Sequence, residues 1–414
     1  MENKRVAIVL GGTNPHITLI ENLQDRGFYT VLVDYYENPP AKKVADEHVQ
    51  DSTLDMDIVL KIAREYKAEL VISTCIDQAN VTACYVAEKL GLPAPYSFQT
   101  SLNVSDKVLM KQIMWDNNLP TSKFICIDDE IELNNTDLVF PVVVKPADAT
   151  GSKGVKRADT QSELSKYIKY ALELSRNNKV VVEEFYTGYE VSVDCFIQDS
   201  VAHVIMTRQK LNFIDHKGAA IQCYVSIAPA KLSEIAKNKI KKIAQGIADA
   251  FHLDTTSLLL QVMVDGDNVN IIEFAPRVGG GLSYQTVKRN TGFDILNATI
   301  NSFLKVKTKL DFQPPKYFLT ANNIYAEPCV YGSVSGHEEL KQDNIIEDFY
   351  FYKTKGMNIS SEMASRDRAG SFIVKAEDYS KLLDKTKTAI ERLEVYDIYG
   401  ERKMRRDIFL KEEL

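Results

Sequence analysis

The residues best suited to bind phosphate lie at the end of an apolar segment. Lys145 ends the run that starts at Phe140, and an ammonium group in such a strand must reach solvent or meet an anion. The loop Gly-Ser-Lys-Gly follows at 151–154, and its glycines let the backbone turn freely and approach a ligand closely. Successive N–H groups in such a loop suit phosphate oxygens. The segment therefore predicts a phosphate site, although the loop lacks the Walker A pattern and by itself also fits an ordinary hairpin tip.

Carboxylates gather in a second segment, where two strands flank a short connection. Glu183 and Glu184 end the apolar run that begins at Val180. Glu190 then begins a strand in which polar and apolar residues alternate as far as 195, so its polar side chains share one face. A polar face on an apolar strand favours a solvent-filled cleft, and ordinary surface polarity is the alternative.

A hairpin further along the chain places two oxygen ligands side by side. The Asp-Gly-Asp-Asn sequence at 265–268 is typical of a hairpin tip, and a loop centred on Asp267 puts Gln261 directly opposite Glu273. Glu273 lies in an apolar strand, where an unpaired carboxylate is costly and a hard cation such as Mg²⁺ would satisfy it. Arg277 and three glycines follow, which adds a guanidinium beside a loop able to approach anions.

A fourth candidate, near the N-terminus, carries a weaker signal. Gly11 and Gly12 follow an apolar strand, and Asp34 follows the next strand, as in a dinucleotide-binding unit. The pattern is Gly-Gly-Thr-Asn rather than G-x-G-x-x-G, so a strand-to-helix turn that lines a substrate pocket is the preferred interpretation. A dinucleotide-dependent oxidoreductase built on this segment would leave the motifs at 140–281 unexplained.

The elements that must position these groups change in style along the chain. Apolar strands at 5–10, 29–33 and 70–73 alternate with helical patterns, which predicts an open, parallel α/β sheet. A helix over 101–122 is expected to follow, and from about residue 124 an α+β body with antiparallel sheet. Its strands are expected at 140–145, 180–186, 190–198, 201–208, 258–264, 270–275, 317–326 and 370–375, and its helices at 161–176, 231–251 and 377–393.

Composition limits the class of protein. The chain has 414 residues, enough for two to four domains, and a formal net charge of −7. This charge argues against a nucleic-acid partner or a membrane surface, both of which favour a basic footprint. Its six cysteines show no CxxC pair and no zinc-like spacing, and no apolar stretch approaches a membrane span. These features predict a cytoplasmic protein with reduced thiols.

Taken in order, the motifs resemble the ATP-grasp superfamily. They are Ser-Asp-Lys at 105–107, the strand lysine, the glycine loop, the Glu-Glu-Phe connection with a later Glu, and the strand Ile-Ile-Glu-Phe-Ala-Pro-Arg. The resemblance implies an N-terminal α/β pre-ATP-grasp domain over 1–100 and an antiparallel ATP-grasp domain over 101–310, with a lid at about 124–186. A small α+β module over 311–414 would complete the chain.

The resemblance also implies a role for each motif. Lys107 and Lys145 would contact ATP phosphates, and Glu190 would bind the ribose. Glu273 and Gln261 would hold Mg²⁺. Further contacts with ATP would come from the glycine loop and from the connection that faces adenine, at Gly151, Ser152, Gly154, Val155, Glu183, Glu184, Phe185 and Tyr186.

The reaction implied by the resemblance is carboxylate–amine ligation. ATP would phosphorylate a small carboxylate, an amine would displace phosphate, and the catalytic residues Arg277 and Lys145 would steady the transferring phosphoryl group. The layout is similar to L-amino-acid ligases, glycinamide ribonucleotide synthetases and biotin carboxylase-like enzymes, so a bicarbonate-activating carboxylase is an alternative. Many members have Glu and Asn where this chain has Gln261 and Ala275, so a catalytically impaired ATP-binding protein is another alternative.

Substrate contacts are expected near these motifs. The expected partners are a small carboxylate and an amine, with no nucleic acid and no membrane, and similar enzymes often form homodimers. The candidate substrate-binding residues are Arg208, Gly280, Arg289 and Asn290.

Overall fold

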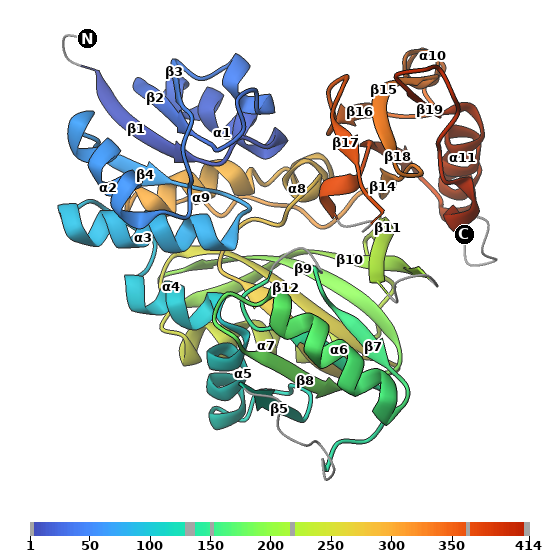
Figure 1. Cartoon of the computed structure of the whole chain (residues 1–414), viewed down its shortest axis with the longest axis horizontal. Helices are drawn as coiled ribbons and strands as arrows, with labels where there is room; N and C mark the ends of the chain where they lie inside the picture. Colours follow the sequence, from blue (N-terminus) through green and yellow to red (C-terminus); the bar gives the residue numbers. More distant parts are fainter. Residues whose placement is uncertain (1–3, 129–136, 150–152, 216–219, 362–364, 410–414) are drawn as a thin grey trace.

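The computed structural model describes residues 4–128, 137–149, 153–215, 220–361 and 365–409. The strands in these ranges form a four-stranded sheet near the N-terminus, an eight-stranded sheet, and two further sheets of four and three strands. Figure 1 shows the N-terminal sheet and the C-terminal elements above the central strands, and the second four-stranded sheet below them. The mixed α/β and α+β fold class expected from the sequence is confirmed.

The N-terminal sheet is parallel, as predicted, and runs in the order β3-β2-β1-β4. Strand β1, one of its two inner strands, is buried on both faces, which explains the continuous apolar sequence of that strand. The sheet has one strand more than the three that were expected. The elements are β1 (Arg5–Leu10), α1 (Asn14–Asp25), β2 (Phe28–Val33), η1 (Pro40–Lys43), β3 (Glu47–Val49), α2 (Met56–Glu65), β4 (Leu70–Ile72) and α3 (Asp77–Leu90).

The single helix predicted over 101–122 is wrong, because the chain forms two helices there. They are α4 (Phe98–Ser105) and α5 (Lys107–Asp116). Asp106 between them is extended, and its carboxylate accepts hydrogen bonds from the backbone N–H groups of Val108 (2.8 Å) and Leu109 (3.2 Å). Such a cap satisfies the first free N–H groups of α5 and makes Lys107 its first residue.

The second four-stranded sheet has the order β5-β8-β6-β7 and is called the β5–β8 sheet below. It packs against α6 through the apolar stripe Leu164, Ile168 and Ala171 of that helix. Neighbouring strands in this sheet are antiparallel. Its elements are β5 (Phe124–Ile127), β6 (Val142–Pro146), β7 (Lys156–Ala158), α6 (Gln161–Leu174) and β8 (Val180–Glu184).

The eight-stranded sheet is antiparallel and has the order β13-β12-β9-β10-β11-β14-β18-β16. It is continuous across residue 310, where a domain boundary is expected from the sequence, and it includes a strand, β11, that was not predicted. Helix α7 packs on the apolar face of β9, β12 and β13. The elements are β9 (Tyr189–Gln198), β10 (Val201–Asp215), β11 (Ala220–Ala228), α7 (Glu234–Ala250), β12 (Thr256–Asp265), β13 (Asn268–Ala275), β14 (Phe318–Ile324), β16 (Asp348–Phe351) and β18 (Gly370–Ala376).

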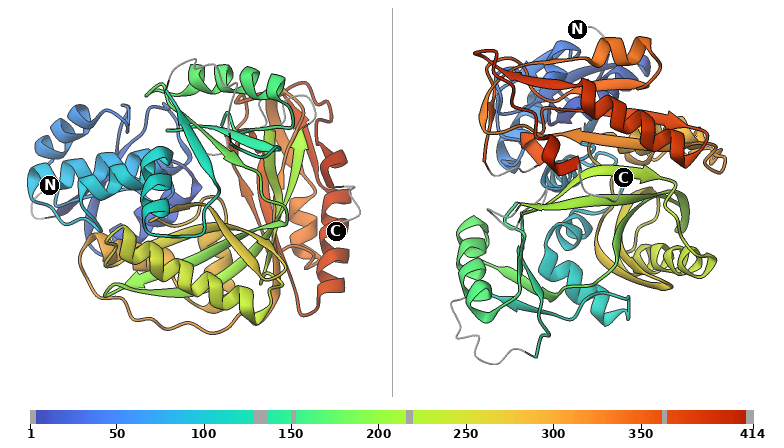
Figure 2. Two further views of the ribbon diagram at one scale, coloured as in Figure 1. Left: turned by 90° about the horizontal axis from the view of Figure 1, so that it is seen from below. Right: turned by 90° about the vertical axis from the view of Figure 1, so that its right-hand side faces the viewer.

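The remaining elements connect these sheets and cover them. Figure 2 shows the N-terminal sheet and the C-terminal elements on the same side of the central strands. None of the described helices combines the length and the apolar character that a membrane span requires. The elements are α8 (Ser283–Thr291), α9 (Ile295–Phe303), β15 (Cys329–Ser335), α10 (His337–Gln342), β17 (Asn358–Ile359), η2 (Ser365–Asp367), α11 (Tyr379–Arg392), β19 (Glu394–Asp397) and η3 (Arg406–Phe409).

Candidate functional site

Two buried lysines converge on one buried carboxylate beside the β5–β8 sheet. Lys145 of β6 and Lys111 of α5 both form ion pairs with Glu183 of β8, and the three side chains are 4–9% exposed. Glu183 stands opposite Val143, two residues from Lys145, so both side chains lie on one face of the sheet. Lys111 also donates to the Thr121 hydroxyl (2.7 Å).

The pKa values of the three groups in this cluster are shifted in different directions. Burial lowers the pKa of Lys111, and the positive charge of Lys145 lowers it further, while Glu183 offsets part of the shift. Burial also acts to lower the pKa of Lys145, but Glu183 and Glu273 outweigh it and raise that pKa. Burial acts to raise the pKa of Glu183, and the two lysines lower it overall. Two ammonium groups therefore face one ionised carboxylate, and the surplus positive charge suits an anion.

Lys107 and the segment before the glycine loop lie next to this cluster. The Lys107 ammonium donates to the carbonyl oxygen of Ala149, and burial lowers its pKa while Glu273 opposes that shift. Gly154 has a φ of +75°, and a Cβ at this position would lie 2.7 Å from Leu174. A side chain is therefore not tolerated there without rearrangement. The predicted phosphate contacts Gly151 and Ser152 lie outside the described residues.

Two backbone N–H groups of the connection predicted to face adenine already form hydrogen bonds within the protein. The N–H group of Glu184 donates to the carbonyl oxygen of Lys123 (3.0 Å), and that of Phe185 donates to the carbonyl oxygen of Pro141 (3.0 Å). The Phe185 ring lies under the Arg157 guanidinium, 4.7 Å from its carbon. A base would therefore have to bind through other groups of this connection, and the adenine contact stays a prediction.

Glu190 is the centre of a second charged group, on the polar face of the eight-stranded sheet. Its carboxylate accepts from Lys210 (2.5 Å), Asn212 (2.7 Å) and Gln261 (2.8 Å). Burial acts to raise the pKa of Glu190, but Lys210 and the hydrogen bonds lower it overall. A ribose, as predicted here, would share this carboxylate with the donors already present.

The hairpin pairing expected from the sequence is confirmed, since Gln261 of β12 stands directly opposite Glu273 of β13. Among the described residues, Glu273 has no hydrogen-bond or ion-pair partner, although its charge raises the pKa of Lys145. Gln261 uses its amide nitrogen on Glu190 and keeps its carbonyl oxygen for a ligand. The described residues contain no group of three His, Cys, Asp or Glu side chains that could hold a metal. One free carboxylate and one amide oxygen nevertheless fit Mg²⁺ that is held mainly by phosphates and water.

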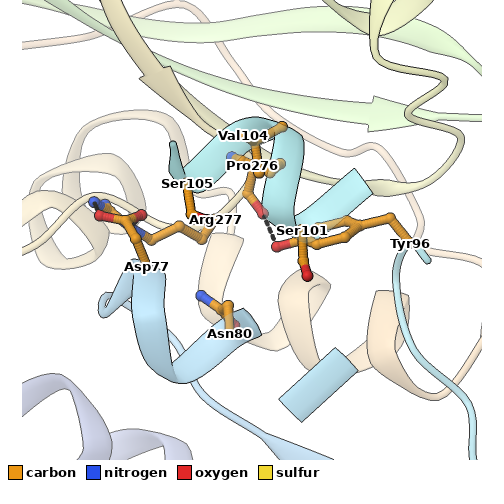
Figure 3. A pocket seen from close by; sticks show the side chains of 8 residues that line it. All are labelled: Asp77, Asn80, Tyr96, Ser101, Val104, Ser105, Pro276 and Arg277. Carbon is orange, nitrogen blue, oxygen red and sulfur yellow. Dashed lines mark hydrogen bonds and ion pairs between the residues drawn. The ribbon is translucent and has the colours of Figure 1, made fainter. Parts of the chain in front are cut away.

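Arg277 joins this site to the N-terminal domain. Its guanidinium makes a two-pronged ion pair with Asp77, the first residue of α3, at 2.6 and 2.9 Å. Burial acts to lower the pKa of Arg277, but Asp77 raises it overall. Figure 3 shows this pair beside a small cavity of about 10 Å³ that Asn80 also lines. Both polar atoms of the Asn80 amide are buried there without a partner among the described residues.

Comparison with known proteins accounts for this geometry. Residues 138–285 match the family model of the ATP-grasp domain. Over these residues the chain is similar to ATP-grasp domains. The matched range includes Lys145, Glu183, the charged group around Glu190 and the Gln261–Glu273 pair. Lys107, Lys111 and Asp77 lie before it.

Curated relatives are similar over parts of their length. A formate-dependent phosphoribosylglycinamide formyltransferase from Methanocaldococcus jannaschii is 25% identical over 277 residues, which are 65% of this chain and 69% of that protein. The N-terminal section of a carbamoyl phosphate synthase large chain from Methanopyrus kandleri is 24% identical over 304 residues, 70% of this chain and 52% of that protein. A D-alanine–D-alanine ligase from Thermosipho africanus is 26% identical over 208 residues, 47% of this chain and 56% of the ligase. The chain thus spans about half the length of the latter two.

Solved structures share the fold over nearly the whole chain. An L-amino acid ligase from Bacillus licheniformis superposes with a TM-score of 0.80 at 22% identity, covering 96% of this chain and 99% of the ligase. A phosphoribosylglycinamide synthetase from Anaerococcus prevotii gives 0.74 at 20% identity, covering 95% and 100%. The fold of this chain is therefore shared with these two proteins over nearly its whole length.

Two candidate substrate residues, Arg208 and Gly280, lie in β10 and in the glycine segment that follows Arg277. Arg208 is 7% exposed and makes a two-pronged ion pair with Asp194 (2.8 and 2.9 Å) and a hydrogen bond to Ser283 (2.8 Å). A substrate carboxylate would have to compete with Asp194 for this guanidinium. Gly280 has open space where a side chain would begin, so its backbone is accessible to a ligand. Both contacts stay predictions.

The other two candidates connect α8 to the C-terminal elements. Arg289 donates to Asp348 of β16 (2.8 Å). The buried Asn290 donates to the Tyr317 carbonyl (2.9 Å) and accepts from the N–H groups of Lys316 and Tyr317 (3.1 Å each). The amide oxygen of Asn290 already accepts two backbone hydrogen bonds and its nitrogen donates one, so a substrate contact through the oxygen would compete with these bonds.

Two residues of the site were missed by the sequence analysis. Lys111 lies four residues after Lys107, a spacing that places both lysines on one face of a helix. Asp77 follows closely after the third parallel strand, at the edge of an α/β sheet where ligands usually bind. Both signals were present in the sequence, but nothing local linked them to the later motifs.

Proposed function

We propose that this protein is an ATP- and Mg²⁺-dependent ligase that activates a small carboxylate as an acyl phosphate for attack by an amine. One observation carries the proposal. Lys111 and Lys145 are buried, Lys107 is half-buried near them, and all three are within the electrostatic reach of the unpartnered carboxylate of Glu273. A site with buried cations and one free acidic oxygen ligand suits a nucleotide triphosphate with its metal.

The proposed chemistry needs positioning and charge neutralisation more than covalent participation of the protein. A carboxylate oxygen of the substrate attacks the γ-phosphorus, and ADP leaves. The amine then attacks the acyl carbon, phosphate leaves with the C–O bond electrons, and the proton of the amine passes to solvent. Lys145 would neutralise charge on the phosphates, and Arg277, held by Asp77, would steady the acyl phosphate.

The metal would be held by Glu273 and by the carbonyl oxygen of Gln261. It would supply positive charge that offsets the phosphate oxygens during transfer. Support for this cofactor pair comes from a fold neighbour, since the biotin carboxylase domain of the 2-oxoglutarate carboxylase from Hydrogenobacter thermophilus was crystallised with MgADP and bicarbonate. That domain was also a dimer, and we extend the expectation of a homodimer to this chain.

A cytoplasmic location is part of the same proposal. All six cysteines are unpaired in the structure. Burial raises the pKa of Cys84 to about 12 and that of Cys75 above its ordinary value, so these thiols are poorly reactive. Unpaired, unreactive thiols are in keeping with a reducing compartment.

The test is a screen for ADP release from purified protein with ATP and Mg²⁺, over pairs of amino acids, simple amines and bicarbonate. Release with a carboxylate and an amine together supports the ligase, whereas release that depends on bicarbonate supports the carboxylase alternative. Absence of ADP above background with every pair rejects the proposal.

Lys145→Ala tests the phosphate assignment within that screen. We expect loss of ATP binding and turnover, because the substitution removes one of the two cations that face Glu183. Lys169→Ala, on the exposed surface of α6, is the matched control and should behave as wild type. Activity of the Lys145 variant within a few-fold of wild type would contradict the assignment.

A further inference from the structure

The Arg368 guanidinium, just before β18, has unused hydrogen-bond donors. Its Nε donates to the Tyr325 hydroxyl (2.9 Å), and its central carbon lies 5.7 Å from the Tyr325 ring centroid. Among the described residues, no carboxylate lies within ion-pair distance of Arg368, and no partner is recorded for its two terminal nitrogens. A half-buried guanidinium without an anion is costly, so this one is prepared for a ligand.

Tyr352, just after β16, offers a second unused donor close by. Its hydroxyl is buried without a hydrogen-bond partner among the described residues. The nearby Ser371 hydroxyl donates instead to Asn323 (2.7 Å). The N–H group of Tyr352 donates to the carbonyl oxygen of Ala369 (3.2 Å), the residue that follows Arg368 in the chain. Tyr352 and Arg368, at the ends of the paired strands β16 and β18, therefore lie on neighbouring backbone segments.

These donors lie beside the nucleotide-binding groups rather than on a remote surface. The Tyr352 hydroxyl is 3.6 Å from the position of a Cβ on Gly281, in the glycine segment that follows Arg277. The Tyr325 hydroxyl, which accepts from Arg368, in turn donates to the carbonyl oxygen of Cys223 in β11 (3.2 Å). Arg368 thus lies near β11, the strand next to β10, which carries Lys210.

We propose that Arg368 and Tyr352 bind an oxyanionic group of the amine substrate. A guanidinium presents two parallel N–H groups that match a carboxylate or a phosphate, and the tyrosine hydroxyl supplies a third donor. The acceptor is then an amine with an anionic group of its own, such as an amino acid or a phosphorylated amine, rather than ammonia or a simple amine. The role of this group as the acceptor rests on the proposed ligase function, whereas the binding of the oxyanion does not.

The kinetic test uses Arg368→Met, Arg368→Lys and, as a matched control in the same part of the chain, Arg392→Met. Arg392 pairs with Asp343 on the exposed surface of α11. With the best substrate pair of the ADP screen, Arg368→Met should raise the KM of the amine substrate about 10- to 100-fold, the range expected for a charge-assisted contact. The KM of ATP should stay unchanged, Arg368→Lys should recover part of the loss, and Arg392→Met should match wild type. A raised KM for ATP, or an unchanged KM for the amine substrate, would overturn the proposal.

Matched substrates identify the oxyanion. Wild type is offered L-alanine against L-alaninamide, and phosphoethanolamine against ethanolamine, together with the carboxylate found in the screen. A preference for L-alanine assigns a carboxylate, and a preference for phosphoethanolamine assigns a phosphate. In either case Arg368→Met should abolish the preference. Equal use of charged and uncharged members of both pairs would contradict the site.

A binding measurement separates this proposal from the ligase proposal. Thermal stabilisation is measured for the twenty L-amino acids and phosphoethanolamine, with wild type, Arg368→Met and Tyr352→Phe, the last of which removes only the hydroxyl. Stabilisation of wild type that both variants weaken supports the site even when no ADP is released. ADP release with no such Arg368-dependent effect in binding or KM rejects the site and leaves the ligase proposal standing. Should Arg368→Met fail to fold, Tyr352→Phe and Arg368→Lys decide by the same criteria.

Discussion

Replacement of Glu183 by glutamine removes the one carboxylate that two buried lysines share. Lys111 and Lys145 both pair with Glu183, and all three side chains are less than a tenth exposed. Removal of one partner of a buried ion pair costs about 3–5 kcal/mol, because the remaining charge stays buried without compensation. Thr121 and the more distant Glu273 offset part of this cost. We therefore expect Glu183→Gln to lower the free energy of unfolding by about 3–5 kcal/mol at pH 7.

The pH dependence of this loss has a definite sign. Without Glu183, the pKa values of Lys111 and Lys145 in the folded protein fall below the unfolded value of about 10.4. The unfolded chain then binds more protons, so the stability of the variant rises with pH as the pH passes the lowered lysine pKa values. In wild type the pKa of Glu183 is lowered, so its contribution is present above an unfolded pKa of about 4.3 and is lost as the pH falls through the folded pKa. The difference in the free energy of unfolding between variant and wild type should therefore become smaller towards both alkaline and acidic pH.

Urea unfolding followed by circular dichroism at pH 4, 7 and 9.5 measures this difference. Glu184→Gln, at the next residue, is the matched control. Among the described residues, the Glu184 side chain accepts a hydrogen bond only from the N–H group of Val139 (3.1 Å), and a glutamine oxygen can keep that bond. The control should lie within about 0.5 kcal/mol of wild type. A loss below about 1 kcal/mol for Glu183→Gln, or a difference that widens at pH 9.5, would refute the reasoning.

Three further substitutions address the catalytic assignments. Asp77→Asn should lower kcat about tenfold with little change in the KM of ATP, because Arg277 loses its charged partner. An unaltered kcat in steady-state kinetics would contradict the role of Asp77 in holding Arg277. Gln261→Glu should lower, or leave unchanged, the Mg²⁺ concentration that gives half-maximal ADP release, because it adds a charged oxygen opposite Glu273; a large loss of activity would show that Gln261 does not ligate the metal. Gly154→Ala should raise the KM of ATP and lower the melting temperature, because its φ of +75° and the nearby Leu174 disfavour a side chain; a thermal melt identical to wild type would be inconsistent with this geometry.

The sequence alone determined those features that depend on neighbours along the chain. The parallel character of the N-terminal sheet followed from apolar strands that alternate with helices. The pairing of Gln261 with Glu273 followed from a hairpin tip only a few residues away. The order of the motifs was enough to indicate an ATP-grasp domain, which the family model matches over residues 138–285, because each motif depends on short spacings that can be read directly.

Only the tertiary structure decided which distant groups meet. Asp77 and Arg277 are 200 residues apart, and the packing of the N-terminal domain against the end of β13 brings them together. Lys111 reaches Glu183 because Asp106 interrupts a helix that the apolar pattern alone had predicted to be continuous. Likewise, the unused donors of Arg368 and Tyr352 can be recognised only after every other partner has been placed. Charge balance in a buried site is a property of the whole packed arrangement, and no local pattern in the sequence encodes it.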